Sequence, residues 1–143
     1  MGRRFRYLPH TADVSFVGYG RTMDEAIESA ALALLNVMVD IKRVMKSNGK
    51  VDSISIKERA TSANELAWFV LQDIVSKVDA MSLNAFEFRV TSLDIKKNVL
   101  SGKLMYKETG KDMSLLGVKA VTPHGLEVAE KGGVFSIKVV VDV

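Results

Sequence analysis

The chain has 143 residues, of which 48% are hydrophobic and 26% are charged, the balance of one globular domain over residues 1–143. It contains no cysteine, which excludes a disulfide framework, a thiolate metal site and a cysteine nucleophile. Its net charge of +3, from 20 basic and 17 acidic side chains, is too small to predict nucleic-acid binding by itself.

The N-terminal segment Met1–Arg6 is basic, but no apolar stretch follows it, so it does not have the pattern of a signal peptide. No apolar run approaches the roughly 20 residues that cross a bilayer, and we expect a cytoplasmic protein without membrane contact. A second basic cluster contains Lys42, Arg43 and Lys46. A patch there could contact RNA phosphates, although such charge more often faces solvent.

A capping box at Thr22–Glu25 predicts the start of the first helix. In such a box, the Thr hydroxyl and the Glu carboxylate each satisfy a backbone amide that the first turn leaves unpaired. Apolar residues then recur at three- and four-residue intervals and form one stripe along the helix: Ile27, Ala30, Ala31, Leu34 and Met38. We expect this helix to end near Val39, with Asp40 as its terminating residue.

A second capping box at Ser62–Glu65 predicts another helix, which should end near Val78 and Asp79. Its apolar stripe has the same spacing as the first: Leu66, Phe69, Val70 and Ile74. The two helices are nearly equal in length, which hints at two copies of a strand–helix unit.

The remaining segments have strand patterns, in which apolar residues alternate with polar ones around Ile54 and around Phe88. Further strands are expected at 13–19, 99–106, 117–122, 126–129 and 134–143. The glycines of Glu130–Gly133 predict a hairpin turn between the last two strands. These elements predict an α+β fold, with two helices packed on a mainly antiparallel sheet.

An aspartate stands near each end of the chain, next to an apolar strand. Asp13 opens the first buried strand, and Asp142 closes the apolar run 134–141, where a carboxylate is costly unless its charge is compensated. If these strands lie side by side, Asp13, Asp142 and the terminal carboxylate of Val143 form a cluster of hard oxygens that suits Ca²⁺, Mg²⁺ or Mn²⁺. The commoner alternative is that each aspartate is a solvated residue at a strand end.

Alternation along the last strand places Asp142 on its more polar face, because successive side chains of a strand point to opposite sides. Ser136, Lys138 and Val140 share that face, whereas Ile137 and its apolar neighbours face the core. The Asp142 carboxylate can therefore reach solvent, a ligand or a metal without entering the core.

No nucleophile, base and orienting group come together in the sequence, so we expect a protein that is not an enzyme. The chain lacks a phosphate-binding glycine loop, a dinucleotide fingerprint and a zinc-binding His pair. His10 is either a partner of the Asp13 site or a structural histidine beside Pro9. Lys119 interrupts an apolar strand, and either extends to the surface or faces the acidic cluster or a phosphate.

Five stretches, in order along the chain, together resemble the archease family: Tyr7–Asp13, Gly20–Ala26, the helix from Ala30 to Asp40, Val118–Thr122 and Val141–Val143. The resemblance implies two strand–helix–strand–strand modules, one nested in the other. It also implies a non-catalytic activator of the GTP-dependent RtcB-type tRNA-splicing ligase, which promotes ligase guanylylation and multiple turnover in tRNA exon ligation.

The resemblance further implies a divalent-metal site, typically with calcium, formed by Asp13, Asp142 and a main-chain or terminal oxygen of Val143. Three other residues are expected as partner contacts or as supports of the metal ligands: His10, Asp40 and Lys119. The tRNA would be contacted indirectly. The alternatives are a chaperone or RNA-binding module in tRNA processing, and a divalent-metal-dependent hydrolase.

Overall fold

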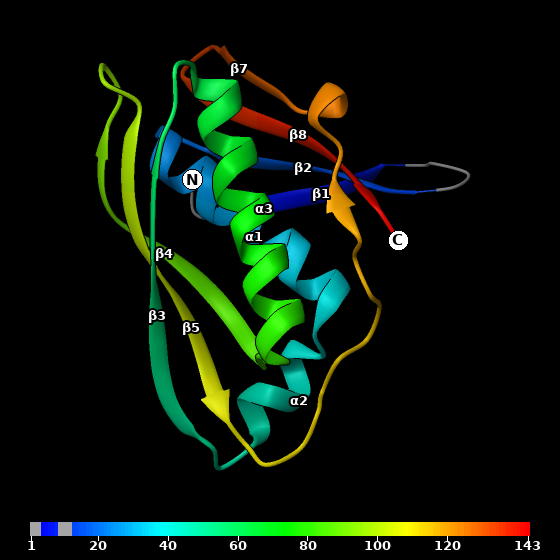
Figure 1. Ribbon diagram of the computed structural model, residues 1–143. Coiled ribbons are helices and arrows are strands. Elements are labelled where there is room, and N and C mark those ends of the chain that lie inside the picture. The colour runs from blue at the N-terminus through cyan, green and yellow to red at the C-terminus, as the bar shows by residue number, and fades with distance from the viewer. Residues whose placement is uncertain (1–3, 9–12) are drawn as a thin grey trace.

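Two antiparallel sheets flank two long helices in the computed structural model of the protein, which describes residues 4–8 and 13–143. The long helices are α1 (Met23–Met38) and α3 (Ala63–Met81), and a short helix, α2 (Ile41–Lys46), follows α1. Each long helix contacts strands of both sheets (Figure 1). The predicted α+β class is therefore confirmed, with a third helix that the sequence did not indicate.

The larger sheet brings the two ends of the chain together. Its order is β1-β2-β8-β6, and β7 also pairs with β8. The strands are β1 (Arg4–Leu8), β2 (Val14–Gly20), β6 (Ala120–Val121), β7 (Glu127–Lys131) and β8 (Val134–Asp142). In Figure 1, β8, in red, lies beside β2, in blue. The first buried strand and the last strand are therefore neighbours, as the two-aspartate hypothesis requires.

The smaller sheet belongs to the middle of the chain. Its order is β3-β5-β4, with bounds Lys50–Arg59 for β3, Val99–Glu108 for β5 and Ala85–Asp94 for β4. The succession β3-α3-β4-β5 is one strand–helix–strand–strand module. It lies in the chain between β2-α1 and β7-β8, which together form a second such module. The nested arrangement expected from the resemblance is thus present.

Both capping boxes form as predicted. At α1 the Thr22 Oγ1 accepts a hydrogen bond from the Glu25 amide at 3.2 Å, and Glu25 Oε2 accepts one from the Arg21 amide at 3.1 Å. The carboxylate thus pairs the amide one residue before the cap. The same contacts recur at α3, with Ser62, Glu65 and Thr61 in these roles.

The apolar face of α1 lies directly on β2, because two glycines of β2 leave room for it. A Cβ at Gly18 would lie 2.4 Å from the amide nitrogen of Ala30, and one at Gly20 would lie 2.4 Å from that of Ala26. Real side chains do not approach so closely, so α1 needs glycine at both positions. This close packing places α1 in the core, where its whole predicted stripe is buried.

Several boundaries differ from the sequence expectations. The segment 117–122 was expected to be a strand, but only Ala120–Val121 is one. Helix α3 continues to Met81 and ends at Ser82, whose φ of 49° is left-handed. Strand β1 and helix α2 were not predicted. No helix of the described ranges is long and apolar enough to cross a membrane.

Candidate metal site at the end of the β2–β8 pair

Asp13 and Asp142 lie at the same end of the β2–β8 ladder. The last pair of that ladder is Val14 with Val141, and the two aspartates follow this pair on their respective strands. Asp142 is exposed and Asp13 is half-buried. Two carboxylates separated by most of the chain thus stand at one sheet end.

The short strand β6 borders Asp142 on its other side. The Lys119 amide donates to the Asp142 carbonyl oxygen at 2.8 Å, and Ala120 is the register partner of Asp142. The Thr122 hydroxyl donates to Asp142 Oδ1 at 3.3 Å. Continuing this register places Lys119, which is exposed, opposite Val143. Lys119 therefore stands at the same sheet end as the two aspartates.

Helix α3 holds β6 in place through the backbone of Val121. The indole Nε1 of Trp68 donates to the Val121 carbonyl oxygen at 2.8 Å. The Val121 amide donates to Gln72 Oε1, also at 2.8 Å. Both backbone groups belong to an edge strand, where no further strand pairs with them. The side chains of α3 supply the missing hydrogen-bond partners. The segment beside Asp142 is thus fixed from two directions, by β8 and by α3.

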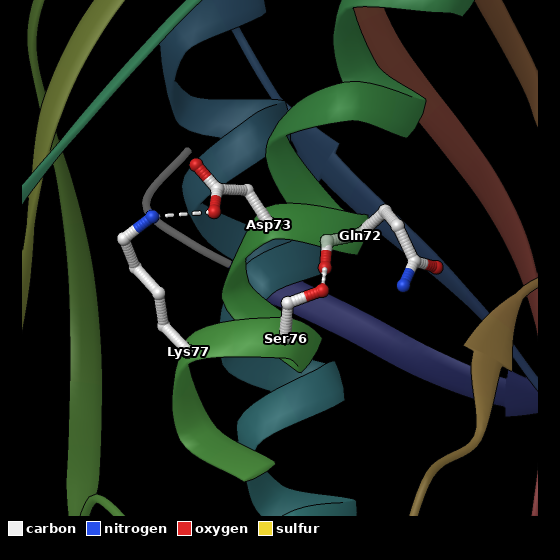
Figure 2. A network of polar contacts seen from close by, with 4 residues as sticks. All are labelled: Gln72, Asp73, Ser76 and Lys77. Carbon is white, nitrogen blue, oxygen red and sulfur yellow. Dashed lines mark hydrogen bonds and ion pairs between the residues drawn. The ribbon is translucent and has the colours of Figure 1, made fainter. Parts of the chain in front are cut away.

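Figure 2 shows α3 around Gln72, the residue whose side chain accepts the hydrogen bond from β6. Gln72 projects from one side of the helix, whereas Asp73 and Lys77 form an ion pair on the other side, with 2.5 Å between Oδ1 and Nζ. The Ser76 hydroxyl donates to the Gln72 carbonyl oxygen within the helix. Sequence reasoning missed Trp68 and Gln72 as supports of the site. Their i, i+4 spacing on one helix face was the available signal.

The donor atoms at this sheet end fit a hard cation. They are the carboxylates of Asp13 and Asp142 and the main-chain oxygen of Val143, and calcium accepts such oxygens in flexible geometry. Within residues 4–8 and 13–143, no three His, Asp or Glu side chains gather closely enough to hold a metal ion. An ion here would therefore depend on main-chain oxygens and water as well as on the two carboxylates.

Two other predicted site residues have different positions. His10 lies outside the described residues. Asp40 caps α2, where its Oδ1 accepts a hydrogen bond from the Arg43 amide at 3.2 Å. Its own amide donates to the Met113 carbonyl oxygen at 2.9 Å. Asp40 thus joins α2 to the start of the segment 113–119, whose other end reaches Asp142.

The same segment is tied to the end of α1. The Leu115 amide donates to the Met38 carbonyl oxygen at 2.8 Å, and the Leu116 amide donates to that of Val37 at 3.3 Å. Just before it, the hydroxyl and amide of Ser114 hydrogen-bond the Asp112 carboxylate and lower the pKa of that group. These contacts explain why 114–117 does not join the sheet.

Comparison with known proteins places the whole chain among relatives of one kind. The family model described as "Archease protein family (MTH1598/TM1083)" matches residues 5–143. The protein archease of Sulfolobus acidocaldarius is 31% identical over 142 residues, which are 98% of this chain and 99% of that protein.

Two solved structures have the same fold. The solution structure of Methanobacterium thermoautotrophicum protein 1598 superposes with a TM-score of 0.76 at 26% identity, covering 97% of this chain and 98% of that one. A crystal structure from Thermotoga maritima, described as an archease and possible chaperone, superposes with a TM-score of 0.64 at 19% identity. This second match covers 95% of this chain and 94% of that one, and it shows the fold alone.

Proposed function

The chain belongs to the archease family, and we propose that it is a non-catalytic, metal-binding accessory protein of an RtcB-type tRNA-splicing ligase. In this function it promotes guanylylation and multiple turnover of the GTP-dependent ligase during tRNA exon ligation in the cytoplasm. The observation that carries the proposal is the pairing of β2 with β8, which brings Asp13 and Asp142 to the same end of the sheet.

The proposed ion is divalent, with Ca²⁺ preferred and Mg²⁺ or Mn²⁺ as alternatives. It would be held by Asp13, Asp142 and a main-chain oxygen of Val143. When bound, the cation would neutralise two carboxylates that otherwise repel each other across the ladder. This sheet end would then present a compact charged centre to the ligase.

The other residues of this sheet end have supporting roles in the proposal. The Thr122 hydroxyl, which donates to Asp142 Oδ1 at 3.3 Å, orients the carboxylate. Lys119 is exposed beside the site and supplies an ammonium group for contact with the ligase. In this proposal neither residue acts as a nucleophile or a base, and the chemistry of ligation belongs to the partner.

The test is guanylylation and RNA joining by a purified RtcB-type ligase, with and without this protein. Wild-type protein should raise both, and Asp13→Asn and Asp142→Asn should remove the stimulation. Asp79→Asn is the matched control, since Asp79 is an exposed carboxylate near the end of α3. Full stimulation by both site variants would reject the site. RNA joining without any ligase would reject the non-catalytic assignment.

A chaperone function is the second candidate, and one observation favours it. Leu115 and Leu116 are neighbours in the chain and are 60% and 44% exposed, which is unusual for two adjacent large apolar side chains. Replacing both with serine should leave guanylylation of the ligase intact and reduce suppression of aggregation. A loss of guanylylation instead would assign this pair to the ligase contact.

A further inference from the structure

A basic hollow lies between α2 and the end of β5, away from the two aspartates. It has a volume of about 480 Å³ and is lined by three cations, Arg43 and Lys46 of α2 and Lys111 of the following loop, and by one carboxylate, Glu108. We call it the α2 hollow. Two further exposed lysines flank it, since Lys42 belongs to α2 and Lys50 is the register partner of Glu108.

The positive charge of the α2 hollow is only partly compensated by the residues that the structure describes. Among the residues that the structure describes, none of Arg43, Lys46 and Lys111 takes part in an ion pair. The nearby carboxylate of Asp112 is instead hydrogen-bonded by Ser114. Three cations and one carboxylate therefore leave a local excess of positive charge around a concave surface, which attracts anions.

The α2 wall of the hollow is fixed by a lysine of β5. Lys107 Nζ donates to the carbonyl oxygens of Met45 and Ser47, at 3.2 and 3.1 Å. A cation at the last carbonyls of a helix is favourable, because the helix end carries partial negative charge. Gly49 also permits close packing there, since a Cβ would lie 2.5 Å from the Glu108 carbonyl oxygen. Arg43 and Lys46 thus belong to a helix whose C-terminal end is held in place by Lys107.

The opposite wall, which carries Lys111, is fixed by Asn84. This side chain is only 7% exposed, and its Nδ2 donates to Thr109 Oγ1 at 2.9 Å and to the Lys111 carbonyl oxygen at 2.7 Å. Its Oδ1 accepts from the Met113 amide at 3.0 Å. All polar atoms of a buried amide are therefore used to shape one loop. A pre-shaped wall reduces the entropy cost of binding a ligand.

We propose that the α2 hollow binds the phosphodiester backbone of RNA directly. Arginine and lysine are the side chains that neutralise phosphates, and the polar residues Ser47 and Asn48 also line the hollow. No aromatic side chain lines it, so there is no platform on which bases could stack. Recognition should therefore be independent of sequence and sensitive to salt.

The choice of RNA, rather than an acidic protein, rests on the proposed function, which puts this protein beside an RNA ligase. The position of the hollow agrees with that choice. Met113 lines the hollow and the Lys119 amide reaches Asp142, so a run of seven residues, six Cα–Cα steps long, connects the two places. A fully extended chain of six residues spans roughly 20 Å. Figure 1 shows this segment, yellow to orange, running from beside α2 toward the C-terminus.

The experiment measures binding of a fluorescent single-stranded RNA to the protein alone, by anisotropy, at several salt concentrations. The variant is Arg43→Gln/Lys46→Gln/Lys111→Gln. The control is Lys96→Gln/Lys97→Gln/Lys131→Gln, which removes the same charge from exposed positions elsewhere. We expect at least a tenfold loss of affinity at low salt for the first triple variant and less than twofold for the control. Melting temperatures check that both variants fold.

The salt dependence gives a second readout. Loss of three phosphate contacts should reduce the slope of log K against log salt by about 2, at roughly 0.7 per contact for a single strand. Equal losses in the two triple variants would reduce the effect to overall charge and overturn the proposal. Inorganic phosphate at millimolar concentration should compete only weakly, because one phosphate engages few cations.

Two further measurements distinguish a failure of the RNA proposal from a failure of the proposed metal site. If the first triple variant loses binding of polyglutamate but not of RNA, the hollow contacts an acidic protein and the proposal is wrong. Asp142→Asn should keep full RNA binding, because its contacts lie at the other end of the 113–119 segment. If Asp142→Asn loses ligase stimulation but still binds RNA, the lost function therefore belongs to the metal site and not to the hollow. If wild-type protein fails to bind RNA but still stimulates guanylylation, only the proposal for the α2 hollow is wrong.

Discussion

Trp68 of α3 donates a hydrogen bond from its indole Nε1 to the carbonyl oxygen of Val121 at 2.8 Å. This contact joins the inserted module to the short strand that borders Asp142. Because β6 has only two residues, its pairing with β8 alone would hold it weakly. The helix therefore contributes to the candidate metal site without supplying a ligand.

Trp68→Phe should destabilise the fold and weaken the metal site together. The partly buried Val121 carbonyl would lose its partner, which typically costs about 1–3 kcal/mol of unfolding free energy. The segment containing Thr122 would then be less well fixed beside Asp142. Urea unfolding measures the first effect and Ca²⁺ calorimetry the second. Gln72→Ala should act in the same direction. Unchanged calcium affinity in both variants would limit α3 to a structural role.

Asp13→Asn and Asp142→Asn should each weaken Ca²⁺ binding by at least tenfold, since a hard cation depends on the charge of its ligands. Without metal, both variants should be as stable as the wild type or slightly more stable, because facing like charges repel. At a calcium concentration 100 times the dissociation constant, wild-type protein should gain about 2.7 kcal/mol of stability. Thermal melting with and without calcium checks this. An equal calcium-induced shift in the variants would contradict the site.

Thr22→Ala and Ser62→Ala should each cost about 1 kcal/mol of stability, because each removes the acceptor of an N-terminal helix amide. The two losses should be similar, since the two caps have the same contacts. Ser76→Ala is the control within α3, as its hydroxyl only donates to a helix carbonyl that is already in the helix ladder. Chemical denaturation compares the three. A neutral effect of both cap variants would show that tertiary packing alone sets these helix ends.

Glu58→Gln should stabilise the protein at neutral pH and do so less in acid. Burial, with the nearby Asp73 carboxylate, raises the pKa of Glu58 above its ordinary value of 4.5. A group with a raised pKa in the folded state favours folding while protonated, and this advantage is lost as pH rises through 4.5 toward the folded-state pKa. The variant should therefore melt higher at pH 7, and the difference should shrink below pH 4.5. A difference that does not vary with pH would exclude this linkage.

Local signals in the sequence determined the helix starts and one turn. Each capping box placed a helix N-terminus, because its contacts lie within four residues. The hairpin before β8 was also predicted, and Gly132 and Gly133 adopt the positive φ values of 59° and 78° that the turn needs. Alternation along β8 correctly assigned Asp142 to the exposed face.

Elements without a local signal were decided by tertiary contacts. Segment 117–122 has strand-like composition, but Leu115 and Leu116 just before it are hydrogen-bonded to the end of α1, so the chain meets β8 only from Lys119 onward and only Ala120–Val121 forms a strand. Helix α2 is too short to show a periodic pattern. Asp40, which was expected to end α1, instead caps the start of α2, and the C-cap of α1 is Val39. A strand depends on its partner, whereas a helix cap depends on its own neighbours.

The candidate metal site also depends partly on local sequence and partly on tertiary contacts. The sequence determined which residues are carboxylates and which face of the last strand carries Asp142. Only the pairing of β2 with β8 brought Asp13 and Asp142 to the same end of the sheet, because strand pairing joins residues that no local interaction relates. The support by Trp68 and Gln72, and the convergence of Arg43 and Lys111 on one hollow, likewise required the folded chain.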